Sequence, residues 1–241
     1  MLYTEEAVKA NLRNREGKRV FYLGKGDTLT PGARDWLQKE RVEILSAQQA
    51  RPERYRLLIG GYAEEKPEHM THLHGDVLVS KLHPRIAFRG AMDTLEAELI
   101  LAQLATPKEI AEQVEEILRF ARSLIRADVL EEPVRAEKLC GLTEQEQRSH
   151  SHRPQDFYGV AHFMPGAGDG MAMARLNRAR CAAREAELRA VAAFSDRDGI
   201  PTRPDILRAM NRMSSMLYIL MIRLRRDNSI PVTGSGNSAG E

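Results

Sequence analysis

Residues 204–224 read PDILRAMNRMSSMLYILMIRL. Apolar side chains recur in this stretch at alternating steps of four and three residues, and this spacing is typical of the inner face of a helix in a bundle. These apolar positions are Ile206, Met210, Met213, Leu217, Leu220 and Leu224. The stretch therefore predicts a long helix that begins near Pro204 and packs against other helices along one seam.

Further helical segments precede this stretch. From about Lys81 the pattern is helical, and it stops before Thr106. Thr106-Pro107-Lys108-Glu109 is interpreted as the capping box of the next helix, which has apolar residues on one face from Ile110 to Leu124. A short helix capped by Thr143 and a helix over 170–194 follow. We therefore expect a mainly α fold, with a four- or five-helix bundle over residues 66–230.

Residues 1–65 have a different pattern, which predicts a small N-terminal α/β module. Apolar runs at 19–23, 42–45 and 55–59 are typical of strands, and Thr30-Pro31 is a typical helix start. Gly24-Lys25-Gly26 is interpreted as a turn, with a phosphate loop as the alternative, although the rest of such a motif is missing. The composition of residues 231–241 predicts a disordered tail.

The composition of the 241 residues restricts the function classes. The 36 lysines and arginines nearly balance the 34 aspartates and glutamates, so a net charge of +2 gives no sign of a nucleic-acid or membrane partner. No apolar run approaches the ~20 residues of a membrane-spanning helix, and the N-terminus lacks the apolar core of a signal peptide. The two cysteines are too few for a disulfide framework. We therefore expect a soluble, cytoplasmic protein.

Two predicted helices carry polar stripes beside their apolar seams. Asn177, Arg180, Arg184 and Glu187 share one face of the first, whereas Asn211, Ser214 and Tyr218 form a stripe on the second. Such stripes could line a cleft for an anion such as a polyphosphate, because neighbouring guanidinium groups can grip adjacent phosphates. The alternative is a solvated face with ion pairs four residues apart. Spacing alone leaves both interpretations open.

Three motifs, in the same order and at similar spacing, resemble those of the ATP:corrinoid adenosyltransferases. They are Lys81 with Arg89-Gly90-Ala91-Met92-Asp93-Thr94-Leu95-Glu96, Phe163-Met164-Pro165-Gly166 with Arg180, Arg184 and Glu187, and Asn211-Arg212-Met213-Ser214-Ser215. Further segments are similar to the ethanolamine-utilisation branch of that family, namely Met70-Thr71-His72-Leu73, Arg126-Ala127-Asp128 and Arg203-Pro204-Asp205-Ile206-Leu207. The resemblance covers residues 28–224.

The resemblance implies a five-helix bundle and a reaction. Members of the family transfer the 5′-deoxyadenosyl group of ATP to the cobalt of a reduced corrinoid, cob(I)alamin, and release triphosphate. Mg²⁺ is expected to bridge the phosphates, since hard oxygen ligands suit it. The family's bundles assemble as trimers that bind ATP and the corrinoid between neighbouring subunits. The ethanolamine branch serves bacterial microcompartments, so the resemblance adds such a compartment and a reductase to the expected partners.

The resemblance also implies roles for charged residues. Arg180 and Arg184 would contact the triphosphate or anchor the subunit interface, and Asp93 would pair with Arg180 of a neighbouring subunit. Lys81 would lie near the phosphates. Because cobalt(I) is the nucleophile, the protein needs no catalytic serine, cysteine or histidine, and its task is positioning and charge stabilisation.

Other motif positions would bind the substrates. Asn211 would orient the nucleotide, Glu187 would hold the arginine-bearing helix in place, and Ser215 stands where the broader family has aspartate. In the family an apolar side chain near the Pro-Gly loop displaces the lower axial ligand of the corrinoid, and Phe163 is the matching residue. The alternatives are Phe157, Met164 and a Phe163 that only packs in the core.

The sequence departs from the family pattern in three respects. The glycine-rich nucleotide loop of the broader family is not legible before Lys81, and Glu185 stands where the family has a second adjacent arginine. The ethanolamine branch often has a cysteine cluster, whereas no cysteine precedes Cys140 here. The remaining candidate metal ligands are His69, His72, His74, His150 and His152. Because these lack the spacing of a four-ligand site, we predict no structural transition metal.

Two other function classes stay open. The first is a catalytically impaired homologue that binds or delivers the corrinoid without adenosylating it. The second is a helical scaffold or nucleic-acid binder that uses the helix carrying Arg175, Arg178, Arg180 and Arg184, and it predicts strongly salt-dependent binding. The near-neutral charge argues against the second class.

Overall fold

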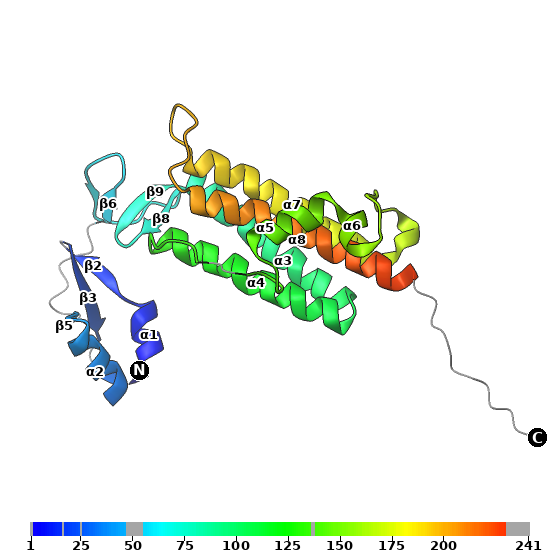
Figure 1. The fold of residues 1–241 in the computed structure, drawn as a ribbon. Helices are drawn as coiled ribbons and strands as arrows, with labels where there is room; N and C mark the ends of the chain where they lie inside the picture. Colours follow the sequence, from blue (N-terminus) through cyan, green and yellow to red (C-terminus); the bar gives the residue numbers. More distant parts are fainter. Residues whose placement is uncertain (1, 16, 25, 47–54, 136–137, 230–241) are drawn as a thin grey trace, which may run out of the picture. The chain divides into compact units, whose positions relative to one another are not determined.

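The computed structural model describes residues 2–15, 17–24, 26–46, 55–135 and 138–229 (Figure 1). The chain divides into two compact units after His83. This division lies further along the chain than the boundary expected after residue 65, because residues 70–80 form a β-hairpin that pairs with the strand at residues 55–57. The tail expected over 231–241 lies outside the described residues.

The first part of the N-terminal unit is a small α/β arrangement, as expected. Its elements are β1 (Leu2–Tyr3), α1 (Glu5–Ala10), β2 (Arg13–Arg15), β3 (Lys18–Leu23), β4 (Thr28–Leu29), α2 (Pro31–Lys39) and β5 (Glu43–Ser46). β3 pairs antiparallel with β2 and parallel with β5, while β1 pairs with β4. The predicted helix start is confirmed, because the Thr30 hydroxyl accepts a hydrogen bond from the amide of Ala33. Val8, Phe21 and Leu37 lie in a core of their own.

The second part of the N-terminal unit is a four-stranded sheet in the order β7-β6-β9-β8. The strands are β6 (Tyr55–Leu57), β7 (Tyr62–Ala63), β8 (Met70–His74) and β9 (Val77–Ser80). Of these, the sequence predicted only the one at 55–59. The β8-β9 hairpin turns at Gly75, whose φ of +49° lies in the left-handed region that favours glycine.

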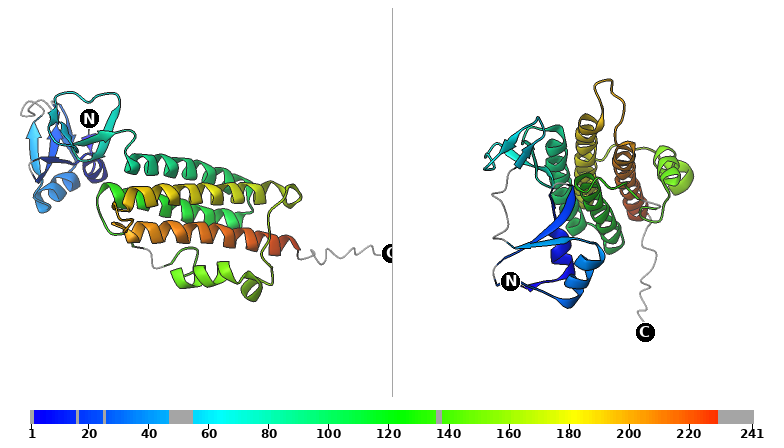
Figure 2. Two further views of the ribbon diagram at one scale, coloured as in Figure 1. Left: turned by 90° about the horizontal axis from the view of Figure 1, so that it is seen from above. Right: turned by 90° about the vertical axis from the view of Figure 1, so that its left-hand side faces the viewer.

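The second unit is a helical bundle, which confirms the expected mainly α fold with an N-terminal α/β module. Four long helices form it: α3 (Pro84–Ala105), α4 (Lys108–Val129), α7 (Gly170–Phe194) and α8 (Pro204–Ser229). The shorter α5 (Glu144–His152) packs along α8 as a fifth helix, and α6 (Pro154–Tyr158) follows it. Figure 2 shows the long helices side by side, with α5 and α6 on the outside of α8.

The core of the bundle contains the apolar seam predicted for α8. Met210, Met213, Leu217 and Leu220 are fully buried, and they pack with apolar residues of α3, α4 and α7. Each methylene group removed from water contributes about 0.8 kcal/mol, so this seam is a main source of stability. Among the described residues, no helix is long and apolar enough to cross a membrane.

The helix ends test the capping predictions. The predicted box at Thr106 is wrong, because the Thr106 hydroxyl donates to the carbonyl oxygen of Ala102 and therefore closes α3 instead of opening α4. Thr143 does cap α5. Its hydroxyl accepts from the amide of Glu146, whose carboxylate accepts from the amide of Thr143.

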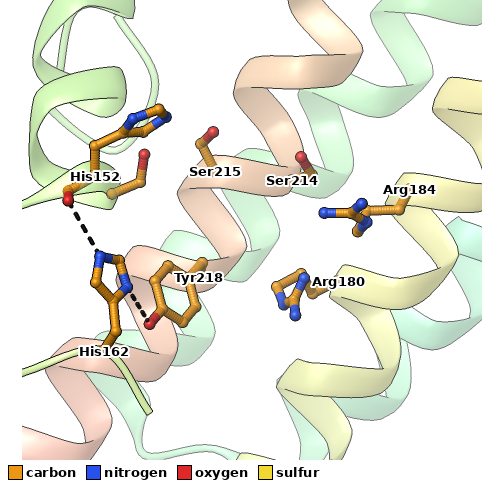
Figure 3. Close-up of a pocket in the computed structure, with 8 residues that line it drawn as sticks. His152, His162, Arg180, Arg184, Ser214, Ser215 and Tyr218 are labelled. Atoms are coloured by element: carbon orange, nitrogen blue, oxygen red, sulfur yellow. Dashed lines mark hydrogen bonds between the residues drawn. The ribbon is translucent and has the colours of Figure 1, made fainter. Parts of the chain in front are cut away.

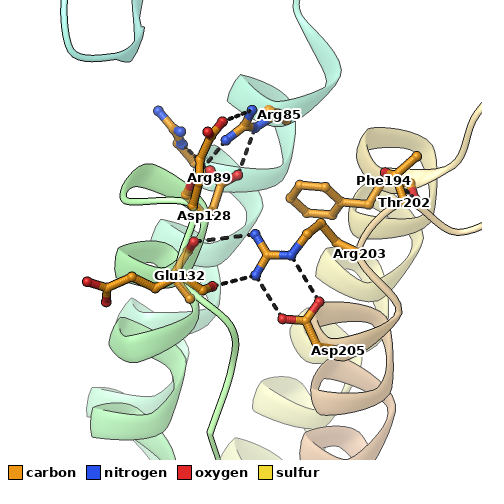
Figure 4. Close-up of polar contacts among 10 residues, drawn as sticks. Arg85, Arg89, Asp128, Glu132, Phe194, Thr202, Arg203 and Asp205 are labelled. Carbon is orange, nitrogen blue, oxygen red and sulfur yellow. Dashed lines mark hydrogen bonds and ion pairs between the residues drawn. The ribbon is translucent and has the colours of Figure 1, made fainter. Parts of the chain in front are cut away.

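A buried ionic cluster joins α3 to the end of α4 (Figure 4). The carboxylate of Asp128 is fully buried and accepts hydrogen bonds from Arg85 Nε at 2.7 Å and Arg89 Nε at 2.6 Å. Beside it, Arg203 forms a bidentate pair with Asp205 and donates to backbone carbonyls at the end of α4 and just beyond. We call Arg85, Arg89, Asp128, Arg203 and Asp205 the paired cluster. It ties three long helices together at one end of the bundle.

Candidate functional site

A cavity of about 320 Å³ opens between α7, α8 and the segment from α5 to α7 (Figure 3). Its lining residues are Ser151, His152, His162, Arg180, Arg184, Ser214, Ser215 and Tyr218. The two arginines extend from α7 toward Ser214, Ser215 and Tyr218 of α8. The cavity thus joins the two polar stripes that the sequence singled out.

The cavity is cationic. Arg180 Nε is buried and has no hydrogen-bond partner in the described part of the chain. The guanidinium carbon of Arg180 lies 5.7 Å from the centre of the Tyr218 ring, a cation–π distance. None of the lining residues is acidic. The site therefore offers unused N–H donors and positive charge, and these features suit an anion.

The alternative of a solvated face with ion pairs does not describe these arginines. Among the residues that the structure covers, no carboxylate lies within ion-pair distance of Arg180 or Arg184. The ion pair that α7 does form between residues four apart joins Glu185 to Arg189. Arg178 pairs instead with Glu98 of α3 at 3.0 Å. Arg178, one of the four arginines that the scaffold interpretation uses, is therefore already paired with an acid.

The serines of α8 present hydroxyl groups at the opposite wall. Ser214 Oγ and Ser215 Oγ donate to the carbonyl oxygen of Asn211 at 3.0 and 3.2 Å. Each donation uses the hydroxyl hydrogen, so the oxygens are left as acceptors.

Asn211 connects α8 to α7 next to the cavity. Its side-chain amide donates to Glu187 Oε1 at 2.8 Å, and its amide oxygen accepts from Arg212. Burial lowers the pKa of Arg212, and the nearby positive charge of Arg148 lowers it further. Neither Asn211 nor Glu187 lines the cavity; the structure places both beside it as a link between the two helices.

The loop before α7 closes one side of the cavity. His162 contacts both Tyr218 of α8 and the backbone of His152. Phe163 is half-buried between the Tyr218 ring, at 6.1 Å, and the Arg225 guanidinium, at 4.2 Å. Arg225 also pairs with Asp169 at 3.5 Å. The motif phenylalanine therefore contacts a residue of the cavity wall.

The alternatives to Phe163 are placed differently. Met164 is 88% exposed. Phe157 stacks on His150 at 3.9 Å between ring centres and does not line the cavity. Of the three candidates, Phe163 alone contacts a described lining residue through its ring.

The predicted site residue Asp93 is not among the residues that line the cavity, and Lys81 belongs to the other unit of the chain. Asp93 is exposed on α3, and no ion pair of Asp93 is found among the described residues. Lys81 follows β9 in the N-terminal unit, where its amide donates to the carbonyl oxygen of His69. Conversely, sequence reasoning missed Ser151 and His162, and it considered His152 only as a candidate metal ligand. The position of His162 directly before the Phe163 motif was the available signal.

Comparison with known proteins identifies the family of this bundle. The family described as cobalamin adenosyltransferase matches residues 61–224, which include all of the long helices up to Leu224. The chain belongs to the cobalamin adenosyltransferase family. The predicted adenosyltransferase enzyme, a transferase, is thereby confirmed.

Curated relatives of this family member confirm the resemblance to the ethanolamine-utilisation type. The corrinoid adenosyltransferase EutT of Salmonella typhimurium is 32% identical over 246 aligned positions, which cover 91% of this chain and 90% of the relative. The EutT protein of Escherichia coli K12 is 30% identical with the same coverage. Both likenesses extend beyond the bundle into the N-terminal unit.

The metal prediction concerns the histidines of this cobalamin adenosyltransferase. Across the described ranges, no three histidine, cysteine or acidic side chains gather in a group that could hold a metal ion. His72 of β8 contacts the Tyr55 ring edge-on, and His150 bonds the Tyr158 hydroxyl. The absence of a structural transition metal stays a prediction.

Proposed function

We propose that the chain transfers the 5′-deoxyadenosyl group of ATP to the cobalt of cob(I)alamin, giving adenosylcobalamin and triphosphate. Family membership supports adenosyl transfer to a corrinoid. The observation that carries the more specific proposal is the cavity between α7 and α8, where two motif arginines face two serines without an acidic neighbour.

The charge of this cavity suits the triphosphate of ATP. Arg180 Nε has no hydrogen-bond acceptor in the described chain, and Arg184 is exposed to the cavity. A guanidinium group donates two parallel hydrogen bonds to a phosphate and keeps its charge at any physiological pH. We propose that Arg180 and Arg184 bind the phosphate oxygens, with Ser214 and Ser215 near the same group.

The reaction needs positioning and stabilisation of a leaving group. The electron pair of cobalt(I), part of the corrinoid substrate, attacks C5′ of ATP, and the C5′–O bond breaks so that both electrons leave with triphosphate. No proton transfer is required at the carbon. The arginines would stabilise the charge of the departing triphosphate, while the protein holds C5′ in line with cobalt.

Mg²⁺ would arrive with ATP. Four lining residues, three serines and Tyr218, offer hydroxyl oxygens, whereas none offers a carboxylate. This donor set fits an ion held mainly by phosphate oxygens and water, a usual arrangement for Mg²⁺. Ser214 and Ser215 are the residues whose oxygens could approach it.

The remaining assignments belong to the same proposal. Asn211, held by Glu187, would orient the nucleotide, and Phe163 would displace the lower axial ligand of the corrinoid. Lys81 would approach the phosphates. Asp93 would pair with Arg180 of a neighbouring subunit in a homotrimer, and its exposure supports such a role.

The cellular setting is also proposed. A reductase would supply cob(I)alamin, because cobalt must be reduced before it can attack carbon. The likeness to the EutT proteins supports a role in ethanolamine utilisation, with the protein in the cytoplasm or inside a microcompartment.

An anaerobic assay tests the proposal. Purified protein, ATP, Mg²⁺ and chemically reduced cob(I)alamin are combined, and formation of light-sensitive adenosylcobalamin is followed by its absorption spectrum. We expect turnover by the wild type and a loss of about 100-fold or more in kcat/KM for Arg184→Ala, since one donor to developing charge contributes about 10²–10³ in rate. Asn211→Ala should raise the KM for ATP.

The matched control is Arg189→Ala, an exposed arginine of α7 that pairs with Glu185 outside the cavity. This variant should retain wild-type turnover. Corrinoid binding without turnover by the wild type would favour the delivery-protein alternative. Equal loss in Arg184→Ala and Arg189→Ala would contradict the assignment of the cavity.

A further inference from the structure

The hydrogen bonds of His162 define one tautomer. His162 Nε2 lies 3.1 Å from the carbonyl oxygen of His152, and His162 Nδ1 lies 3.0 Å from the Tyr218 hydroxyl. Because a carbonyl oxygen can only accept, Nε2 carries the hydrogen. In the neutral ring Nδ1 therefore accepts, and the Tyr218 hydroxyl donates to it. The imidazole thus connects the end of α5 to the middle of α8.

The Tyr218 ring is in turn the support of Arg180. The guanidinium carbon of Arg180 lies 5.7 Å from the ring centre, and the structure gives Arg180 no hydrogen bond or ion pair within the described residues. The position of this guanidinium therefore depends on where the Tyr218 ring lies. A fixed ring reduces the rotamer freedom that Arg180 must lose when it binds an anion.

The loop that carries His162 has anchors of its own. Phe163 packs under the Arg225 guanidinium, Asp169 pairs with Arg225, and Asp169 also accepts from the amide of Gly166. Removal of the imidazole leaves these contacts intact. The loss of His162 should therefore affect Tyr218 more than it affects the fold of the loop.

We infer that His162 is a positioning residue for the anion site: by holding the Tyr218 hydroxyl, it fixes the ring against which Arg180 is set to bind phosphate. The inference rests on the proposed function for the identity of the anion. Independently of the anion, His162 is inferred to position Arg180 through Tyr218.

The same bundle contains a matched control for this arrangement. His150 Nδ1 lies 2.8 Å from the Tyr158 hydroxyl, and the Arg223 guanidinium lies 5.8 Å from the Tyr158 ring. Arg223 already donates to Gln113 at 3.0 Å, and none of these residues lines the cavity. The control has the same three residue types, but its guanidinium already donates to a neighbouring side chain.

The experiment measures binding of inorganic triphosphate by titration calorimetry. We expect His162→Ala to weaken binding about tenfold, as for loss of one functional hydrogen bond. His162→Gln should restore affinity to within about threefold of the wild type, because an amide both accepts and donates. His150→Ala should bind like the wild type. Thermal unfolding of each variant verifies that it is folded.

A double-mutant cycle tests the route. Tyr218→Phe removes the hydroxyl but keeps the ring, so it should weaken triphosphate binding about as much as His162→Ala. If His162 acts through that hydroxyl, the double variant binds no more weakly than either single variant. If the double variant instead shows the product of the two single losses of triphosphate affinity, the inference is overturned. Wild-type affinity in His162→Ala would overturn it as well.

The same titrations separate this inference from the proposed function. If the wild type binds triphosphate with the predicted pattern but forms no adenosylcobalamin, the positioning role stands and the proposed reaction fails. If the wild type turns over and His162→Ala matches it in both triphosphate affinity and the KM for ATP, the reaction stands and the positioning role fails.

Discussion

Two groups of arginines lie in the same helical bundle and differ in what surrounds each guanidinium. In the paired cluster, Arg85 and Arg89 donate to the buried Asp128 carboxylate. In the cavity, Arg180 and Arg184 have no acidic partner among the described residues. The paired arginines have their acceptor within the chain, whereas the cavity arginines have donors left for a ligand.

The physical cost of burial explains the difference. A buried charge without a partner is strongly unfavourable, so a partly buried arginine inside a fold is normally neutralised by a carboxylate or by carbonyl oxygens. Arg180 departs from this rule at its buried Nε. A site that tolerates such a cost is a candidate for function, because an incoming anion would satisfy the group.

The largest effect is expected from breaking the paired cluster. Asp128→Ala removes the buried carboxylate to which two mostly buried arginines donate. We expect the free energy of unfolding to fall by about 3–5 kcal/mol, the usual cost of removing one partner of a buried ion pair. Chemical denaturation measures this change. A loss below about 1 kcal/mol would show that the cluster is not structural.

The opposite result is expected at the cavity. Arg180→Ala should weaken inorganic triphosphate binding about 100-fold, while the free energy of unfolding stays the same or rises, because an unsatisfied buried donor is removed. Calorimetry and denaturation are run on the same preparation. A stability loss comparable to that of Asp128→Ala would show that Arg180, like the arginines of the paired cluster, stabilises the fold, and it would contradict the comparison.

A smaller effect concerns the pH dependence of the paired cluster. The hydrogen bonds from Arg203 lower the pKa of Asp205 from 3.8 to about 2. A depressed pKa in the folded state gives stability that is present above about pH 4 and is lost as the pH falls toward 2. This difference in pKa corresponds to about 2 kcal/mol of folding stability, and the partial exposure of Asp205 reduces that contribution to about 1 kcal/mol.

Asp205→Asn should therefore lower stability at pH 7 by about 1 kcal/mol and flatten the stability curve between pH 4 and pH 2. Denaturation across this pH range measures both effects. A variant whose curve stays as steep as that of the wild type would show that another carboxylate carries the dependence.

The smallest effect is expected for an arginine outside both groups. Arg189 pairs with Glu185 one turn away on the exposed side of α7. Arg189→Ala should change the free energy of unfolding by less than about 0.5 kcal/mol and leave triphosphate affinity unchanged. A marked loss of affinity would mean that general positive charge, and not the cavity, binds the anion.

Much of the fold could be predicted because its signals are local. The seam from Ile206 to Leu224 repeats with the helical period, and the cap at Thr143 lies within four residues. The cap at Thr106 could not be predicted securely, since its hydroxyl had a choice between the helix before it and the helix after it.

The candidate site was predictable only in part, because its contacts are distant in sequence. The stripes on α7 and α8 indicated Arg180, Arg184, Ser214 and Tyr218, whereas the contact of His162 with Tyr218 spans 56 residues. The partners of Asp128 lie 39 and 43 residues away and share no period with it. Such pairs become visible only when the helices are packed.

The position of Arg203 late in the sequence has a consequence for the order in which contacts form while the chain is synthesised. Arg203 and Asp205 stand at the start of the last helix, yet they bind the carbonyl oxygens of Ala127 and Glu132 and the amide of Val134. On the ribosome these backbone groups emerge about 70 residues before their partners, several seconds earlier at usual rates of synthesis. These contacts at the end of α4 can therefore form only after the start of α8 has been synthesised.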